Sequence, residues 1–182
     1  MLKLYKRGPS GILYWEAWTA DRAVTVHWGQ VGERGQTQRL EVAPDQSAES
    51  VIAAAAARPH ACGFTEAPRE SLHELVVQFI LDEEDIGAEA ENLEFLAALK
   101  VQLDQCLGWT GNGQCTGGEI GAKEGDTLNM FCRVVEPEAA VASLAKHLES
   151  FGYGGEFCIG RAVGGAMQTV YPEDCRGDPW MW

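Results

Sequence analysis

Apolar and polar residues alternate in the first third of the chain with the two-residue period of β-strands. Strand patterns recur in three segments, residues 11–18, 22–28 and 36–42. In the second of these, Val24, Val26 and Trp28 share one face, and the short polar turn before it predicts a hairpin. Residues 48–58 predict an alanine-rich helix that ends at Pro59. We expect an antiparallel sheet covered by one helix.

The rest of the chain alternates between strand-like and helix-like patterns. Strands are predicted at residues 72–81, 114–120, 128–135 and 156–163. Residues 88–107 and 137–151 carry apolar side chains at three- and four-residue steps, which predicts two amphipathic helices. The resulting order, βαββαβ, is that of the ferredoxin-like fold. The predicted fold class of the whole chain is therefore α+β, and the second and fourth of these strands are expected to form open sheet edges.

Charge divides the chain in the same place as the patterns do. The 182 residues include 27 acidic and 14 basic ones, for a net charge of −13. Residues 1–64 carry a net charge of +1, whereas residues 65–182 carry −14. The change falls in a polar stretch around residues 65–71, so we predict two domains, 1–66 and 67–182. The second, acidic domain ends in an aromatic tail with two tryptophans, Trp180 and Trp182.

Residues 28–36, which read WGQVGERGQ, resemble the signature of the WGR domain. The upstream Tyr14-Trp15-Glu16 and the helix downstream fall where that family has them. The resemblance covers residues 1–66 and implies an antiparallel sheet with one helix. In poly(ADP-ribose) polymerases the WGR domain sits at a DNA break and contacts neighbouring domains, and in bacterial proteins it is an accessory module.

The chain departs from this family at one position, where Gln30 replaces the arginine. Arginine offers a charged fork for phosphate or carboxylate, whereas glutamine offers a neutral amide. Arg34 and Arg39 lie near in sequence and could compensate in part. Trp28 either packs in the core, as its place in the alternation suggests, or forms an exposed stacking surface. The resemblance and these neighbours give Trp28, Gln30, Arg34 and Arg39 as the candidate partner-binding or nucleic-acid-binding residues.

No residue pattern predicts catalysis, a cofactor or a metal site. The glycine-rich residues 108–125 lack the strand–loop–helix context and the Gly-Lys-Ser/Thr ending of a phosphate loop, so we interpret them as a tight connection and a bulged edge strand. A cysteine–histidine enzyme would have to use His147, and no motif selects its cysteine. The six cysteines include no CxxC pair, which favours free thiols, among them Cys132 and Cys158, in a reduced, cytoplasmic protein.

These observations favour a non-catalytic binding or adaptor protein. Its WGR-like module would recognise a partner protein or a nucleic-acid end, with weak or no binding to nucleic acid because of the negative net charge. The alternative is an acidic inhibitor or immunity-type protein that covers a basic enzyme. An enzyme that uses the glycine-rich stretch is the least favoured hypothesis. No stretch reaches the 18 or more apolar residues of a membrane helix. The sequence leaves the partner and the oligomeric state open.

Overall fold

The structure, a computed structural model, describes residues 1–80, 89–120, 127–153 and 157–172. The chain divides into two compact units. The N-terminal unit comprises Met1–Ser71 together with Trp109–Gly111, and the C-terminal unit comprises Leu72–Gly108 together with Asn112–Trp182. The aromatic tail expected at the end of the chain, from residue 173 on, lies outside the described residues.

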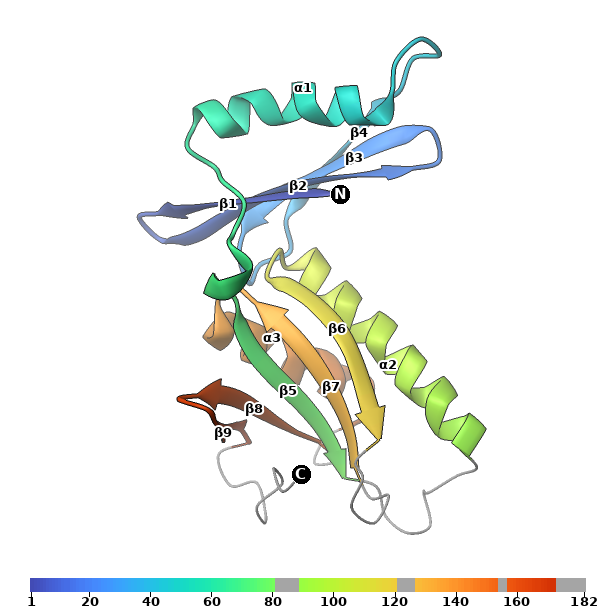
Figure 1. Cartoon of the computed structure of the whole chain (residues 1–182), viewed down its shortest axis with the longest axis vertical. Helices are drawn as coiled ribbons and strands as arrows, with labels where there is room; N and C mark the ends of the chain where they lie inside the picture. Colours follow the sequence, from blue (N-terminus) through green and yellow to red (C-terminus); the bar gives the residue numbers. More distant parts are fainter. Residues whose placement is uncertain (81–88, 121–126, 154–156, 173–182) are drawn as a thin grey trace. The chain divides into compact units, whose positions relative to one another are not determined.

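The N-terminal unit is built on a four-stranded antiparallel sheet in the order β1-β2-β3-β4 (Figure 1). The strands are β1 (Leu2–Gly8), β2 (Gly11–Ala20), β3 (Ala23–Gln30) and β4 (Gln36–Glu41). Side chains alternate between the faces of a strand, so Trp15 shares one face with its register partners Leu4 and Trp28. Val24 and Val26 lie on the same face, which forms the apolar core of this unit. The three strands predicted from the sequence are present as β2, β3 and β4, and the structure adds β1, which the sequence did not predict.

Helix α1 (Ala48–Ala61) covers this apolar face (Figure 1). Ser47 caps its start, because the Ser47 hydroxyl accepts a hydrogen bond of 3.2 Å from the Ser50 amide. The predicted end at Pro59 is wrong, since Pro59 lies inside the helix. Proline removes only its own N–H, and the Cys62 amide still donates to the Arg58 carbonyl at 2.9 Å, which closes the last turn.

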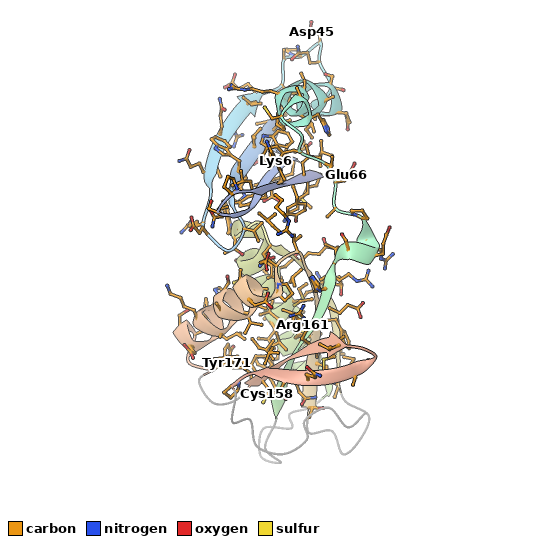
Figure 2. All side chains as sticks on the ribbon, turned by 90° about the vertical axis from the view of Figure 1, so that its left-hand side faces the viewer. Lys6, Asp45, Glu66, Cys158, Arg161 and Tyr171 are labelled. Carbon is orange, nitrogen blue, oxygen red and sulfur yellow. The ribbon has the colours of Figure 1, made fainter. Side chains whose placement is uncertain are left out.

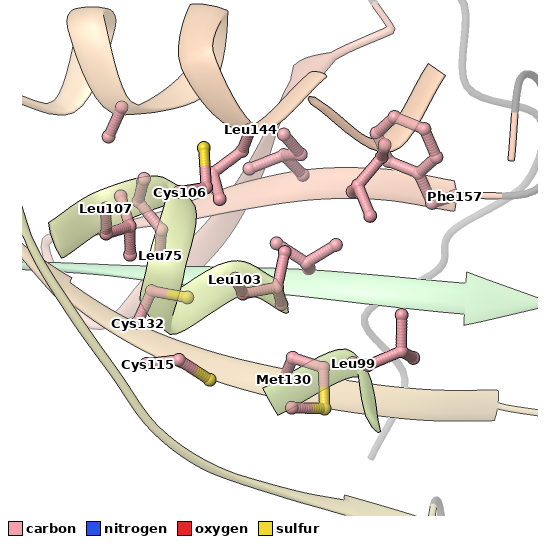
Figure 3. Close-up of a cluster of buried hydrophobic side chains, with 14 of the residues drawn as sticks. Leu75, Leu99, Leu103, Cys106, Leu107, Cys115, Met130, Cys132, Leu144 and Phe157 are labelled. Carbon is pink, nitrogen blue, oxygen red and sulfur yellow. The ribbon is translucent and has the colours of Figure 1, made fainter. Parts of the chain in front are cut away.

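The C-terminal unit contains a five-stranded antiparallel sheet in the order β6-β7-β5-β8-β9. The strands are β5 (His73–Ile80), β6 (Gly113–Ile120), β7 (Thr127–Val134), β8 (Phe157–Val163) and β9 (Ala166–Tyr171). The helices are α2 (Glu89–Trp109) and α3 (Pro137–Ser150), and a short 3₁₀ turn, η1 (Arg69–Ser71), precedes β5. Both helices pack their leucines, such as Leu103 and Leu144, against Leu75 and Met130 of the sheet (Figure 3). The main core therefore lies on the face that the helices cover, and a smaller cluster around Val76 and Cys158 lies on the other face.

The prediction of two open sheet edges is confirmed for β6 and wrong for β8. Strand β6 is an edge strand, and its register shifts between Cys115 and Gly117, as the interpretation of the glycine-rich stretch predicted. Strand β8, however, is an inner strand, because β9 pairs with it. The turn at Gly164 and Gly165 has positive φ angles of 60° and 86°, which lets the chain fold back directly after β8.

Candidate binding groove and the network on the opposite sheet face

A groove of about 510 Å³ opens between α1 and the sheet of the N-terminal unit. Its lining residues come from strands β2, β3 and β4, from α1 and from the segment after α1: Trp15, Val26, Trp28, Gln38, Leu40, Ala55, Arg58, Pro59, Cys62 and Phe64. From α1 the small Ala55 lines the groove, whereas the sheet contributes the large indole rings of Trp15 and Trp28.

The groove combines aromatic walls with positive charge. Arg58 is exposed and lines the groove, and it makes no ion pair with any residue in the described ranges. Lys6 places its ammonium 5.9 Å from the centre of the Phe64 ring, on the α1 side of the sheet (Figure 2). The groove thus offers apolar surface for a side chain and the Arg58 guanidinium for a carboxylate, with Lys6 against the Phe64 ring of its wall.

The opposite face of the same sheet buries a polar network. The Lys3 ammonium lies 3.0 Å from one carboxylate oxygen of Glu16, and the other oxygen lies 2.7 Å from Nδ1 of His27. On the far side of the imidazole, Nε2 lies 2.8 Å from the Tyr14 hydroxyl. Glu16, His27 and Tyr14 are 3%, 0% and 1% exposed. The register places Glu16 opposite both Lys3 and His27, so strand pairing builds this network.

Every polar atom of the network has a hydrogen-bond partner. The Gly35 amide donates to the Tyr14 oxygen, and the two ring nitrogens of His27 bond to the Tyr14 hydroxyl and to Glu16. Burial raises the pKa of Tyr14, and the Glu16 charge raises it further. Burial opposes ionisation of Glu16, but the bond from His27 and the charge of Lys3 outweigh it and lower the pKa of Glu16. Glu16 is therefore an ionised, fully paired carboxylate.

Residues 109–111 close this network from outside the first 71 residues. The Trp109 ring lies 5.2 Å from the His27 ring and 6.4 Å from that of Trp18, both edge to face. Gly111 has a φ of +63°, and a Cβ there would overlap the Tyr14 ring. Because Tyr14, Glu16 and His27 are buried and bonded to one another, the geometry supports a stabilising role for the network.

The predicted binding residues do not share one site. Trp28 is half-buried and lines the groove, whereas Arg39 is exposed on the opposite face of the sheet. The Gln30 amide donates to the Ser10 carbonyl at 3.3 Å and so fastens the β1–β2 turn. The Arg34 guanidinium lies 5.7 Å from the centre of the Trp109 ring.

Sequence reasoning missed most of the groove and the whole network. Arg58 and Phe64 line the groove because α1 packs on the sheet, and no local sequence pattern predicts how a helix packs on a sheet. The network had a signal, since Tyr14 and Glu16 are two residues apart on one strand and His27 lies between two apolar residues of the next. That spacing places polar groups on one face of a hairpin.

The cysteines differ in state. Cys62 is free and exposed, and Cys106, Cys115 and Cys132 are free and buried. The expectation of a free thiol at Cys158 is wrong, because this buried residue is disulfide-bonded. Within the described ranges, no cluster of three or more His, Cys, Asp or Glu side chains could hold a metal ion. No helix in the described part of the chain is long and apolar enough to cross a membrane.

Comparison with known proteins gives no match. Neither a protein-family model, nor a curated protein, nor a solved structure matches the chain.

Proposed function

We propose that the protein is a non-catalytic binding protein, or adaptor, whose N-terminal unit is a WGR-like module that recognises a partner protein. The groove between α1 and the sheet carries this proposal. It is open, it is lined by two indole rings and Phe64, and its volume of about 510 Å³ is in the range of small-ligand sites. A partner would insert an apolar or aromatic side chain there.

Charge at the groove defines the partner further. Arg58 lines the groove and Lys6 lies on the Phe64 ring, so a carboxylate next to the inserted side chain is favoured. Charge pairs at the rim of an interface contribute to specificity and association rate. The preferred partner segment is therefore an apolar side chain followed or preceded by Asp or Glu.

The position of the arginines favours a protein over a nucleic-acid end. Gln30 is engaged with the β1–β2 turn, Arg34 with Trp109, and Arg39 points away from the groove face. No cluster of three cations therefore surrounds Trp28 within the described residues. Affinity for a phosphate backbone depends on several such contacts.

For the C-terminal unit we propose a ferredoxin-like fold with one added strand. The order β6-β7-β5-β8 with antiparallel neighbours, and two helices packed on one face, support this assignment. Because fold does not define activity, this unit contributes no functional claim beyond its acidic surface and its edge strand β6.

A random heptapeptide library displayed on phage and selected on the full chain tests the proposed function. We expect selected peptides to pair a large apolar residue with Asp or Glu. Arg58→Glu is expected to weaken their binding by at least about tenfold, equal to about 1.4 kcal/mol. Arg39→Glu is the matched control, since it reverses the same exposed charge on the opposite face.

Three outcomes would contradict the proposal. The library yields no peptide above background, or Arg39→Glu abolishes binding while Arg58→Glu does not. The third outcome is a set of basic peptides whose binding depends on carboxylates of residues 67–182, which would favour the inhibitor alternative.

A further inference from the structure

Three free cysteines gather at one end of the core of the C-terminal unit (Figure 3). Cys106 comes from α2, Cys115 from β6 and Cys132 from β7. The Cys106 thiol donates to the Ser143 carbonyl of α3, 3.5 Å away. Cys115 and Cys132 instead face each other across two strands.

Their backbone positions are those of a pair that a disulfide can join. Cys115 and Cys132 are register partners in the antiparallel pair β6–β7, and both contribute to the same core. Residues directly opposite in such a pair have Cα atoms about 4.5–5.5 Å apart. Disulfides span Cα separations of about 4.4–6.8 Å. The bond can therefore form without moving the strands.

The two thiols are chemically unequal. The Cys132 thiol donates a hydrogen bond to the Cys115 sulfur, which lowers the pKa of Cys115 and raises that of Cys132. Burial raises the pKa of Cys132 further. Lys100 also lowers the pKa of Cys115, whereas Asp104, which accepts from the Cys115 amide, opposes this. A cysteine of lowered pKa opposite one of raised pKa is the arrangement of an attacking and a resolving cysteine.

We propose that Cys115 and Cys132 form a peroxide-reactive dithiol site that closes to a disulfide. The Cys115 thiolate attacks one oxygen of hydrogen peroxide and the O–O bond breaks, which leaves a sulfenic acid and a hydroxide that becomes water on protonation. The Cys132 sulfur, as its proton leaves, attacks the sulfenic sulfur and expels the second water. Two thiols and one peroxide thus give one disulfide and two waters, and the sulfurs lose the two electrons that the peroxide gains.

A small oxidant can reach this buried pair. Cys115 and Cys132 are 3% and 1% exposed, but Cys115 lies on the edge strand and directly before the register shift at Gly117. Bulged edge strands have fewer ladder bonds and open locally at low cost. Hydrogen peroxide is close to water in size, so a small local opening admits it.

The test uses the full chain with Cys62→Ser, which removes the exposed thiol. The folded protein is treated with equimolar hydrogen peroxide, unfolded, alkylated with N-ethylmaleimide and digested with trypsin and chymotrypsin. Trp109 separates Cys106 from Cys115, and Lys123 separates Cys115 from Cys132, so mass spectrometry assigns every link. We expect a Cys115–Cys132 peptide that the untreated protein lacks. The Cys158 disulfide is present before and after treatment.

Two further variants sharpen the result. Cys106→Ser, the matched buried cysteine, is expected to leave the new disulfide unchanged. Cys132→Ser is expected to prevent it and to leave a sulfenic acid on Cys115 that dimedone traps. The proposal is overturned if the treated, folded Cys62→Ser protein alkylates fully at Cys115 and Cys132, or if the new link joins Cys106.

Discussion

The Tyr14 hydroxyl lies 2.8 Å from Nε2 of His27, with both side chains almost completely buried beneath Trp109. A buried imidazole nitrogen that loses its partner retains the full cost of its desolvation. The free energy of unfolding of the N-terminal unit is therefore expected to depend strongly on this single hydrogen bond.

Tyr14→Phe tests this dependence, because it removes only the hydroxyl. The Nε2 atom and the Gly35 amide both lose their partner, so we expect the free energy of unfolding to fall by about 1–3 kcal/mol. Tyr153→Phe is the matched control, since its hydroxyl bonds to no residue among those described. Urea unfolding followed by circular dichroism measures both. Equal losses in the two variants would show that the network contributes nothing specific.

Gly35→Ala is expected to destabilise the same unit for a steric reason. A Cβ at Gly35 would overlap the Tyr14 hydroxyl and the Trp28 carbonyl oxygen, and would lie 2.8 Å from Nε2 of His27. Gly108→Ala is the control, because nothing lies within 4 Å of a Cβ there, and alanine is favoured over glycine in a helix by about 1 kcal/mol. Thermal unfolding is expected to shift down for the first variant and up or not at all for the second.

Glu16→Gln is expected to destabilise the protein in a pH-dependent way. Because the folded-state pKa of Glu16 is lowered, its stabilising effect is complete above the ordinary value of 4.5 and is lost as the pH falls through the folded-state pKa. The difference in unfolding free energy between the variant and the unchanged protein is thus expected to be about 1–3 kcal/mol at neutral pH. It should shrink in acid.

Urea unfolding at several pH values measures this difference. Glu41→Gln, an exposed carboxylate on β4, serves as the control and should show little change at any pH. A difference for Glu16→Gln that grows in acid would contradict the lowered pKa of Glu16.

Binding of duplex DNA is expected to be weak or undetectable at physiological salt. Gln30→Arg introduces the arginine that the WGR signature has at the corresponding position and should strengthen binding to DNA ends, with a salt slope steeper by about one unit. Gln46→Arg adds the same charge at another exposed position and should have less effect. Gel-shift titrations at several salt concentrations decide this, and tight, salt-resistant binding by the unchanged protein would refute the expectation.

Residues 70–182 are expected to fold cooperatively as a fragment, since they contain a whole sheet, two helices and one core. Residues 1–66 should be less stable, because a unit of this size is marginal and the fragment lacks Trp109 and Gly111. Circular dichroism during heating measures both. If the fragment of residues 70–182 shows no cooperative transition, the chain is one interwoven domain.

The sequence predicted β2 and β3 despite their buried Glu16 and His27, and it missed β1 and β9, which each lie at one edge of a sheet. Strand β1 escaped notice because Lys3, Lys6 and Arg7 interrupt its apolar residues, and only pairing with β2 reveals that Lys3 neutralises Glu16. Strand β9 is mostly half-exposed and therefore carries a weak pattern. These contacts depend on register, which a local pattern does not fix.

The candidate site was predictable only in its strand residues. Trp28 was identified from its strand position and from the resemblance of residues 28–36 to the WGR signature. Arg58 and Phe64 escaped because the tilt of a docked helix depends on packing between distant segments. Closeness in sequence did not bring Gln30, Arg34 and Arg39 together. Gln30 bonds to the β1–β2 turn, Arg34 lies by Trp109, and strand alternation places Arg39 on the face opposite the groove.

The two faces of the N-terminal sheet can be engineered separately, because one holds the buried network and the other holds the groove. The network of Lys3, Tyr14, Glu16 and His27 lies on one face of the sheet, whereas Gln38, Ala55 and Arg58 line the groove on the other face. Substitutions at these three positions can be randomised together, because polar groups that would be costly to disturb lie on the other side of the backbone. The unit is thus a scaffold whose ligand preference can be reselected while its stability stays in place.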